Sequence, residues 1–106
     1  MSDGDSVTLT ITQVSDYEFR VRFDDTSVAD LLIDESPPIG RNAGPSPARL
    51  LGAAIGGCLS SSLLFALRKY KNTPGPIGAS VRVDTVRNAR GRLRLGRISA
   101  DIRLPE

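Results

Sequence analysis

The sequence GPSPARLLGAAIGGCLSSSLLFALRKYK, residues 44–71, predicts one long helix. Ser46 suits the N-cap position, because its hydroxyl can accept a hydrogen bond from an otherwise unpaired amide of the first turn. Pro47 follows at the first helical position, where a missing N–H costs nothing. Three basic residues close the stretch, where cations offset the negative end of the helix dipole. Asn72 and Gly75 then end the helical pattern.

The uncharged part of this helix, residues 50–67, is apolar on all sides, so both of its sides are expected to be shielded from water. Its length also fits a membrane span, and residues 52–56 have the GxxxG pattern of packed membrane helices. Six glycines and serines, however, dilute its apolar content below that of typical spans. A central helix covered by a sheet, or by a second copy of itself, is the favoured prediction, and a membrane span is the alternative.

Alternating apolar and polar residues predict strands on both sides of the helix. Residues 7–12, 17–23 and 28–33 are expected to form an antiparallel meander. Residues 79–85 and 93–104 are expected to form a hairpin around a loop that contains Gly91. Along the last strand the apolar positions change from odd to even numbers, which predicts a β-bulge at Gly96 and Arg97. The predicted fold is α+β, in the order βββ-α-ββ, with a long central helix packed against a sheet.

The length and composition predict a single domain, residues 1–106, with few chemical options. The chain has no histidine, which excludes histidine metal sites, Ser-His-Asp triads and imidazole acid–base chemistry. We expect neither a metal nor a cofactor. The single cysteine, Cys58, excludes an internal disulfide and fits a reducing compartment, and no signal peptide is evident. The expected location is the cytoplasm.

Charge is unevenly distributed along the chain. Nine of the twelve acidic residues precede position 36, and twelve of the fourteen basic residues lie from position 41 onward. Several arginines would lie on the outer face of the predicted hairpin and could track phosphates. No aromatic residues alternate with them for base stacking, so we expect no nucleic-acid partner.

The segment LLIDESPPIGRNAGPSPARLLGAAIGGCL, residues 31–59, resembles the signature of the OsmC/Ohr family, the osmotically inducible and organic hydroperoxide resistance proteins. GPSP at residues 44–47 and AAIGGC at residues 53–58 match the family pattern in residue type and spacing. The predicted βββ-α-ββ order matches as well. The resemblance implies an intertwined homodimer whose sheets wrap the central helices.

The resemblance also implies a chemistry in oxidative-stress defence. A helix cysteine, matched here by Cys58, attacks an organic hydroperoxide and becomes a sulfenic acid, while an arginine and a glutamate hold its thiolate. No local motif identifies the arginine, so Arg20, Arg22 and Arg41 are all candidates. Each of these arginines could equally be a solvated side chain.

Three departures from the family pattern stand out. Ala48 occupies the position just after the helix-start proline where many family members have the glutamate. No second cysteine exists to resolve the sulfenic acid, so an external thiol reductant is expected. The helix and strand that follow in family members have no counterpart, which suggests a short form or a fragment.

Plainer interpretations of the same residues remain open. Cys58 could be a small buried core residue, since free cysteine is among the most buried residue types. The hydroxyls of residues 60–62 could bond back to the preceding helical turn. The loop 34–45 could border a site or be a plain connector. The alternative function is then a non-catalytic module of the same fold that binds a small apolar molecule, with no membrane partner.

Overall fold

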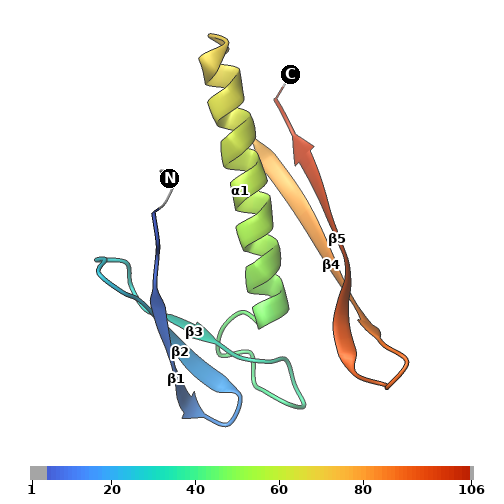
Figure 1. The fold of residues 1–106 in the computed structure, drawn as a ribbon. Helices are drawn as coiled ribbons and strands as arrows, with labels where there is room; N and C mark the ends of the chain where they lie inside the picture. Colours follow the sequence, from blue (N-terminus) through green and yellow to red (C-terminus); the bar gives the residue numbers. More distant parts are fainter. Residues whose placement is uncertain (1–4, 106) are drawn as a thin grey trace. The chain divides into compact units, whose positions relative to one another are not determined.

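The computed structural model describes residues 5–105 and has the predicted βββ-α-ββ order (Figure 1). It contains an N-terminal unit, residues 1–47, and a C-terminal unit, residues 48–106. The α+β prediction is confirmed. The elements are β1 (Leu9–Ser15), β2 (Glu18–Phe23), β3 (Leu31–Ile33), α1 (Pro47–Lys69), β4 (Gly78–Arg87) and β5 (Leu93–Arg103).

The N-terminal unit is built on an antiparallel sheet in the order β1-β2-β3. Strand β3 is shorter than the predicted strand 28–33, and the side chain of Thr26 explains the difference. The Thr26 hydroxyl donates to the carbonyl of Phe23 at 2.7 Å and accepts from the amide of Val28 at 3.2 Å. These bonds bend the chain after β2, so pairing with β2 resumes only at Leu31.

The two faces of β2 differ in polarity. Val21 is 4% exposed and is the one buried apolar side chain among residues 5–105. Phe19 and Phe23 lie on the same face of β2 and are half-buried. The opposite face carries Glu18 and two arginines, because side chains alternate along a strand. One face of this sheet is therefore apolar and the other charged.

Helix α1 begins as predicted, with Ser46 at the N-cap position and Pro47 as its first residue. Backbone hydrogen bonds cap the C-terminus of this helix. The amide of Asn72 donates to the carbonyl of Leu67 at 2.9 Å, and the amide of Lys71 donates to the carbonyl of Arg68 at 3.0 Å. Lys71 has a φ of 65°. This is a Schellman motif in which a lysine takes the position that usually holds glycine.

The C-terminal unit packs the β4–β5 hairpin against α1 through two helical glycines. A Cβ atom at Gly56 would lie 2.6 Å from Cγ2 of Val81, and one at Gly52 would lie 2.9 Å from Cγ2 of Val83. Both distances are too short for a real contact, so only glycine lets the valines approach this closely. The glycines of the GxxxG pattern therefore serve helix–hairpin packing within the chain.

The β4–β5 pairing contains the predicted bulge. Asp84 pairs with Arg97 and Thr85 with Leu95, which leaves Gly96 as the extra residue. A Cβ at that glycine would lie 2.8 Å from Cγ1 of Val86, so the bulge needs a residue without a side chain.

Much apolar surface stays exposed on these elements. Leu9, Ile11 and Val14 of β1 and Phe65 of α1 are exposed, Phe65 to 72%. Within the described residues, α1 has the length and apolar content of a membrane span. Core helices of soluble proteins meet the same criteria, so length and composition do not by themselves indicate a membrane.

Candidate functional site

The thiol of Cys58 lies in the middle of α1 and is exposed. Gly56 faces Val81 of the hairpin. Two further residues turn an α-helix by about 200°, so Cys58 points away from the hairpin that packs on α1. The interpretation of Cys58 as a buried core residue is therefore wrong for the single chain.

The helix face around Cys58 is apolar and open. Leu51 and Phe65 lie seven residues before and after the thiol, which places all three residues on one stripe of the helix. Leu51 is 37% exposed and Phe65 72% exposed. Ala54 and Ser61, within one turn on either side, keep the surface near the sulfur low. A reagent can reach the sulfur across an apolar surface.

Two of the candidate arginines lie on β2 in the N-terminal unit. Arg20 and Arg22 alternate with Glu18 on the charged face of this strand and are exposed. Among residues 5–105, neither guanidinium has a hydrogen bond or an ion pair. Both remain free to pair with an anion.

The third candidate, Arg41, is held by Glu18. Its Nη2 lies 2.9 Å from Oε1 of Glu18, and its Nε donates to the same oxygen at 3.0 Å. The Glu18 side chain is 10% exposed and the Arg41 side chain 77% exposed. The buried carboxylate of Glu18 therefore holds one edge of the Arg41 guanidinium, while most of the Arg41 side chain stays exposed to solvent.

The loop that carries Arg41 is organised by Asp34. The Asp34 carboxylate accepts hydrogen bonds from the amides of Glu35 at 2.7 Å, Arg41 at 3.1 Å and Ala43 at 3.1 Å. The amide of Ala43 contributes most to lowering the pKa of Asp34 below its usual value of 3.8, against the opposing effect of burial. The loop 34–45 is therefore an ordered support for Arg41 and not a loose connector.

A small polar cavity of about 260 Å³ lies beside this ion pair in the N-terminal unit. Its walls come from the β1–β2 turn, the end of β3 and the Asp34 loop. The lining residues are Ser15, Asp16, Tyr17, Glu18, Asp34, Ile39, Gly40 and Arg41. The structure thus groups Arg20, Arg22 and Arg41 with Glu18 in one unit, whereas Cys58 belongs to the other unit.

Sequence reasoning missed Glu18 and Asp34. Glu18 shares the polar face of β2 with Arg20 and Arg22. An acidic residue among arginines was the signal that could have identified it. Asp34 ends a strand just before a loop with glycines, which is a typical place for a carboxylate that binds loop amides. Within residues 5–105, no three Asp, Glu or Cys side chains are arranged as metal ligands.

Comparisons with known proteins identify the fold. No protein-family model matches this chain, and no curated protein matches it. An OsmC-like protein of unknown function from Vibrio cholerae is 13% identical, with a TM-score of 0.78 over 96% of this chain and 77% of that one. A Psychrobacter arcticus protein, named for osmotic stress induction and detoxification response, is 16% identical. Its TM-score is 0.80 over 100% of this chain and 75% of that one.

The chain therefore has the fold of OsmC-like proteins. The structural match confirms the resemblance predicted from residues 31–59 at the level of the fold. In this fold the long helix α1 is the element that carries Cys58.

Proposed function

We propose that the protein is a thiol-dependent redox protein that reduces organic hydroperoxides through Cys58 in oxidative-stress defence. The observation that carries the proposal is the exposed thiol on the long helix of an OsmC-like fold. The apolar stripe around Cys58, with Leu51 and Phe65, suits the alkyl or aryl part of an organic hydroperoxide.

In the proposed reaction, the Cys58 thiolate attacks the outer oxygen of the hydroperoxide. An S–O bond forms while the O–O bond breaks, and the leaving alkoxide takes up a proton and departs as the alcohol. Cys58 is oxidised to a sulfenic acid, and the hydroperoxide is reduced. Because the chain contains one cysteine, an external thiol then attacks the sulfenic sulfur and releases water. A second external thiol reduces the mixed disulfide and restores Cys58.

We propose Arg41 as the cation that stabilises the reacting thiolate, with Arg20 and Arg22 as the alternatives. The resemblance implies an arginine paired with a glutamate, and Arg41 forms such an ion pair with Glu18. The glutamate here comes from β2, whereas the helix-start position that many family members use is Ala48. A cation near the sulfur favours the thiolate over the thiol.

We further propose that the protein acts as a homodimer in the cytoplasm, without a nucleic-acid or membrane partner. The exposed apolar side chains of β1 and α1 support self-association, because Val21 is the one buried apolar side chain among residues 5–105, which is a small core. The dimer would cover part of this apolar surface and line each thiol site with residues of both copies.

The proposal is tested by treating the reduced protein with one equivalent of cumene hydroperoxide in the presence of dimedone. We expect one dimedone adduct per chain, located on Cys58 by peptide mass spectrometry, together with formation of the alcohol. Adding a dithiol in place of dimedone should give repeated turnover. The Cys58→Ser variant should show neither adduct nor turnover. A folded wild-type protein that consumes no hydroperoxide and forms no adduct would overturn the proposal.

The second candidate function is a non-catalytic module of the same fold that binds a small apolar molecule. Ala48 and the absence of a second cysteine favour it, because both remove groups that the family chemistry uses. The Cys58→Ser variant distinguishes this function from the first, because it should keep full affinity for an apolar ligand if the thiol does no chemistry.

A further inference from the structure

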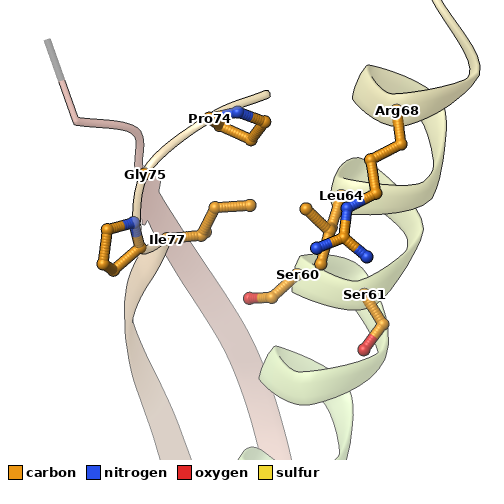
Figure 2. Close-up of a pocket in the computed structure, with 8 residues that line it drawn as sticks. Ser60, Ser61, Leu64, Arg68, Pro74, Gly75 and Ile77 are labelled. Atoms are coloured by element: carbon orange, nitrogen blue, oxygen red, sulfur yellow. The ribbon is translucent and has the colours of Figure 1, made fainter. Parts of the chain in front are cut away.

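A cavity of about 450 Å³ lies within the C-terminal unit, between the second half of α1 and the segment that leads into β4 (Figure 2). Its volume is within the range of roughly 300–1,000 Å³ that is typical of small-molecule sites. Its lining residues are Ser60, Ser61, Leu64, Arg68, Pro74, Gly75, Pro76 and Ile77. Cys58 does not line it, so the cavity has no part in the proposed thiol chemistry.

Arg68 supplies the only charge among the residues that line this cavity. Figure 2 shows its side chain running back along the helix, with the guanidinium beside Leu64 and above the two serines. An arginine in the last helical turn often caps the final carbonyls. Here the carbonyls of Leu67 and Arg68 accept the amides of Asn72 and Lys71 instead.

Within residues 5–105 the guanidinium of Arg68 makes no hydrogen bond and no ion pair, so it is available to bind a ligand. No acidic residue lines the cavity, so its positive charge is not neutralised there.

Two hydroxyls and three apolar side chains complete the site. Ser60 and Ser61 do not bond back to the preceding turn, and neither hydroxyl has a hydrogen-bond partner among residues 5–105. Both can therefore donate to a ligand. Leu64 forms the apolar wall on the helix side, and Pro74 and Ile77 form it on the opposite side of the cavity in Figure 2. The cavity thus combines one free cation, two free hydroxyls and an apolar wall.

We propose that this cavity binds a small amphipathic carboxylate, with the carboxylate on Arg68 and the hydrocarbon chain against Leu64 and Ile77. A guanidinium offers two parallel N–H donors that match the two oxygens of a carboxylate, and such charge-assisted pairs are stronger than neutral hydrogen bonds. Ser60 or Ser61 can donate a further bond to a carboxylate oxygen. Inorganic anions have no apolar surface to bury against this wall, so we expect them to bind more weakly than an amphipathic carboxylate.

The test uses octanoate as the probe and the reduced protein. Titration followed by ¹H–¹⁵N NMR should give saturable shifts in residues 60–68 and 74–77. Octanamide, which has the same chain but no charge, should bind at least tenfold more weakly, and so should acetate, which has the charge but no chain. Arg68→Gln should weaken octanoate binding at least tenfold, as expected for the loss of one charged hydrogen-bonding partner.

Arg97→Gln is the matched control, since Arg97 is a β5 arginine that does not line the cavity. It should leave octanoate affinity within twofold of wild type. Arg68→Lys keeps the charge but loses the two-pronged geometry, so it should bind with intermediate affinity. Equal affinity for octanoate and octanamide, unchanged binding in Arg68→Gln, or shifts elsewhere in the chain would each overturn the proposal.

Discussion

The Arg41 guanidinium binds the Glu18 carboxylate through two nitrogens, with Nη2 at 2.9 Å and Nε at 3.0 Å from the same Oε1 atom. The pair joins positions 23 residues apart in sequence. Glu18 is the first residue of β2, and Arg41 lies in the loop that precedes α1. The ion pair therefore ties this loop to the sheet of the N-terminal unit.

Glu18→Gln should destabilise the protein modestly. The amide keeps one acceptor oxygen but loses the charge that the two nitrogens share. Because Arg41 is largely exposed and solvent screens the pair, the expected loss is about 1 kcal/mol in the free energy of unfolding measured in urea. The loss should shrink in high salt. The control is Glu35→Gln, which removes a carboxylate that has no ion pair within residues 5–105. A loss that is equal in both variants would contradict a specific role for the pair.

Asp34 should make stability depend on pH. Its pKa is lowered in the folded state, chiefly by the amide of Ala43, so its charged form is stabilised relative to the unfolded chain. That stabilisation is complete above the usual value of 3.8 and is lost as the pH falls through the lower, folded-state pKa. The melting temperature of Asp34→Asn should lie below that of wild type at pH 7, and the gap should close toward pH 3.

The control for Asp34 is Asp30→Asn, which changes an exposed carboxylate that makes no hydrogen bond or ion pair within residues 5–105. Its melting temperature should follow that of wild type across the same pH range. A gap between wild type and Asp34→Asn that stays constant from pH 7 to pH 3 would show that the charge of Asp34 does not stabilise the loop.

The fold could be predicted because its signals are local. Ser46 and Pro47 mark the start of α1 by residue type. The apolar positions change from odd to even numbers near Gly96, which marks the bulge. The resemblance of residues 31–59 then identified the OsmC-like fold, which the solved structures confirm.

The site could be predicted only in part, because its contacts are between distant residues. Nothing near Glu18 in sequence indicates that Arg41 will bind it, and the three amides that bind Asp34 come together only when the loop closes. Whether Cys58 is buried or exposed also could not be predicted from nearby residues. The answer depends on whether the hairpin packs on the helix face of Gly56 or on the opposite face. The contact of Gly56 with Val81 shows that the hairpin packs on the face of Gly56.

Gly56 and Gly57 should respond in opposite directions to the same substitution. A Cβ at Gly56 would meet Val81, whereas a Cβ at Gly57 has nothing within 4 Å. Gly57→Ala should stabilise the protein by up to about 1 kcal/mol through helix propensity. Gly56→Ala gains the same propensity but forces the hairpin away, with a typical overpacking cost of about 1–3 kcal/mol. Urea unfolding of the pair measures the difference, and equal destabilisation by both would show that Gly57 is covered too.

Lys71→Gly should stabilise the end of α1. Lys71 has a φ of 65°, a conformation that costs a residue with a side chain roughly 1–2 kcal/mol. Glycine adopts it freely, so the melting temperature should rise by several degrees. Lys69→Gly is the matched control. It removes the same charge two residues earlier, inside the helix, and should lower the melting temperature. A fall in both variants would show that the charge of Lys71 matters more than its backbone conformation.

Arg41→Gln should slow the proposed oxidation of Cys58 by hydroperoxide. If Arg41 stabilises the thiolate in the transition state, losing one charge-assisted hydrogen bond should lower the second-order rate constant about tenfold or more. The measurement is stopped-flow consumption of cumene hydroperoxide by the reduced protein.

Arg20→Gln and Arg22→Gln test the two alternatives, and Arg92→Gln, near the tip of the hairpin, is the control. Because Glu18 holds Arg41, Glu18→Gln should also slow the reaction, by less than Arg41→Gln does. A tenfold loss in Arg20→Gln or Arg22→Gln with none in Arg41→Gln would reassign the role to a β2 arginine, and Glu18–Arg41 would then be a structural pair alone.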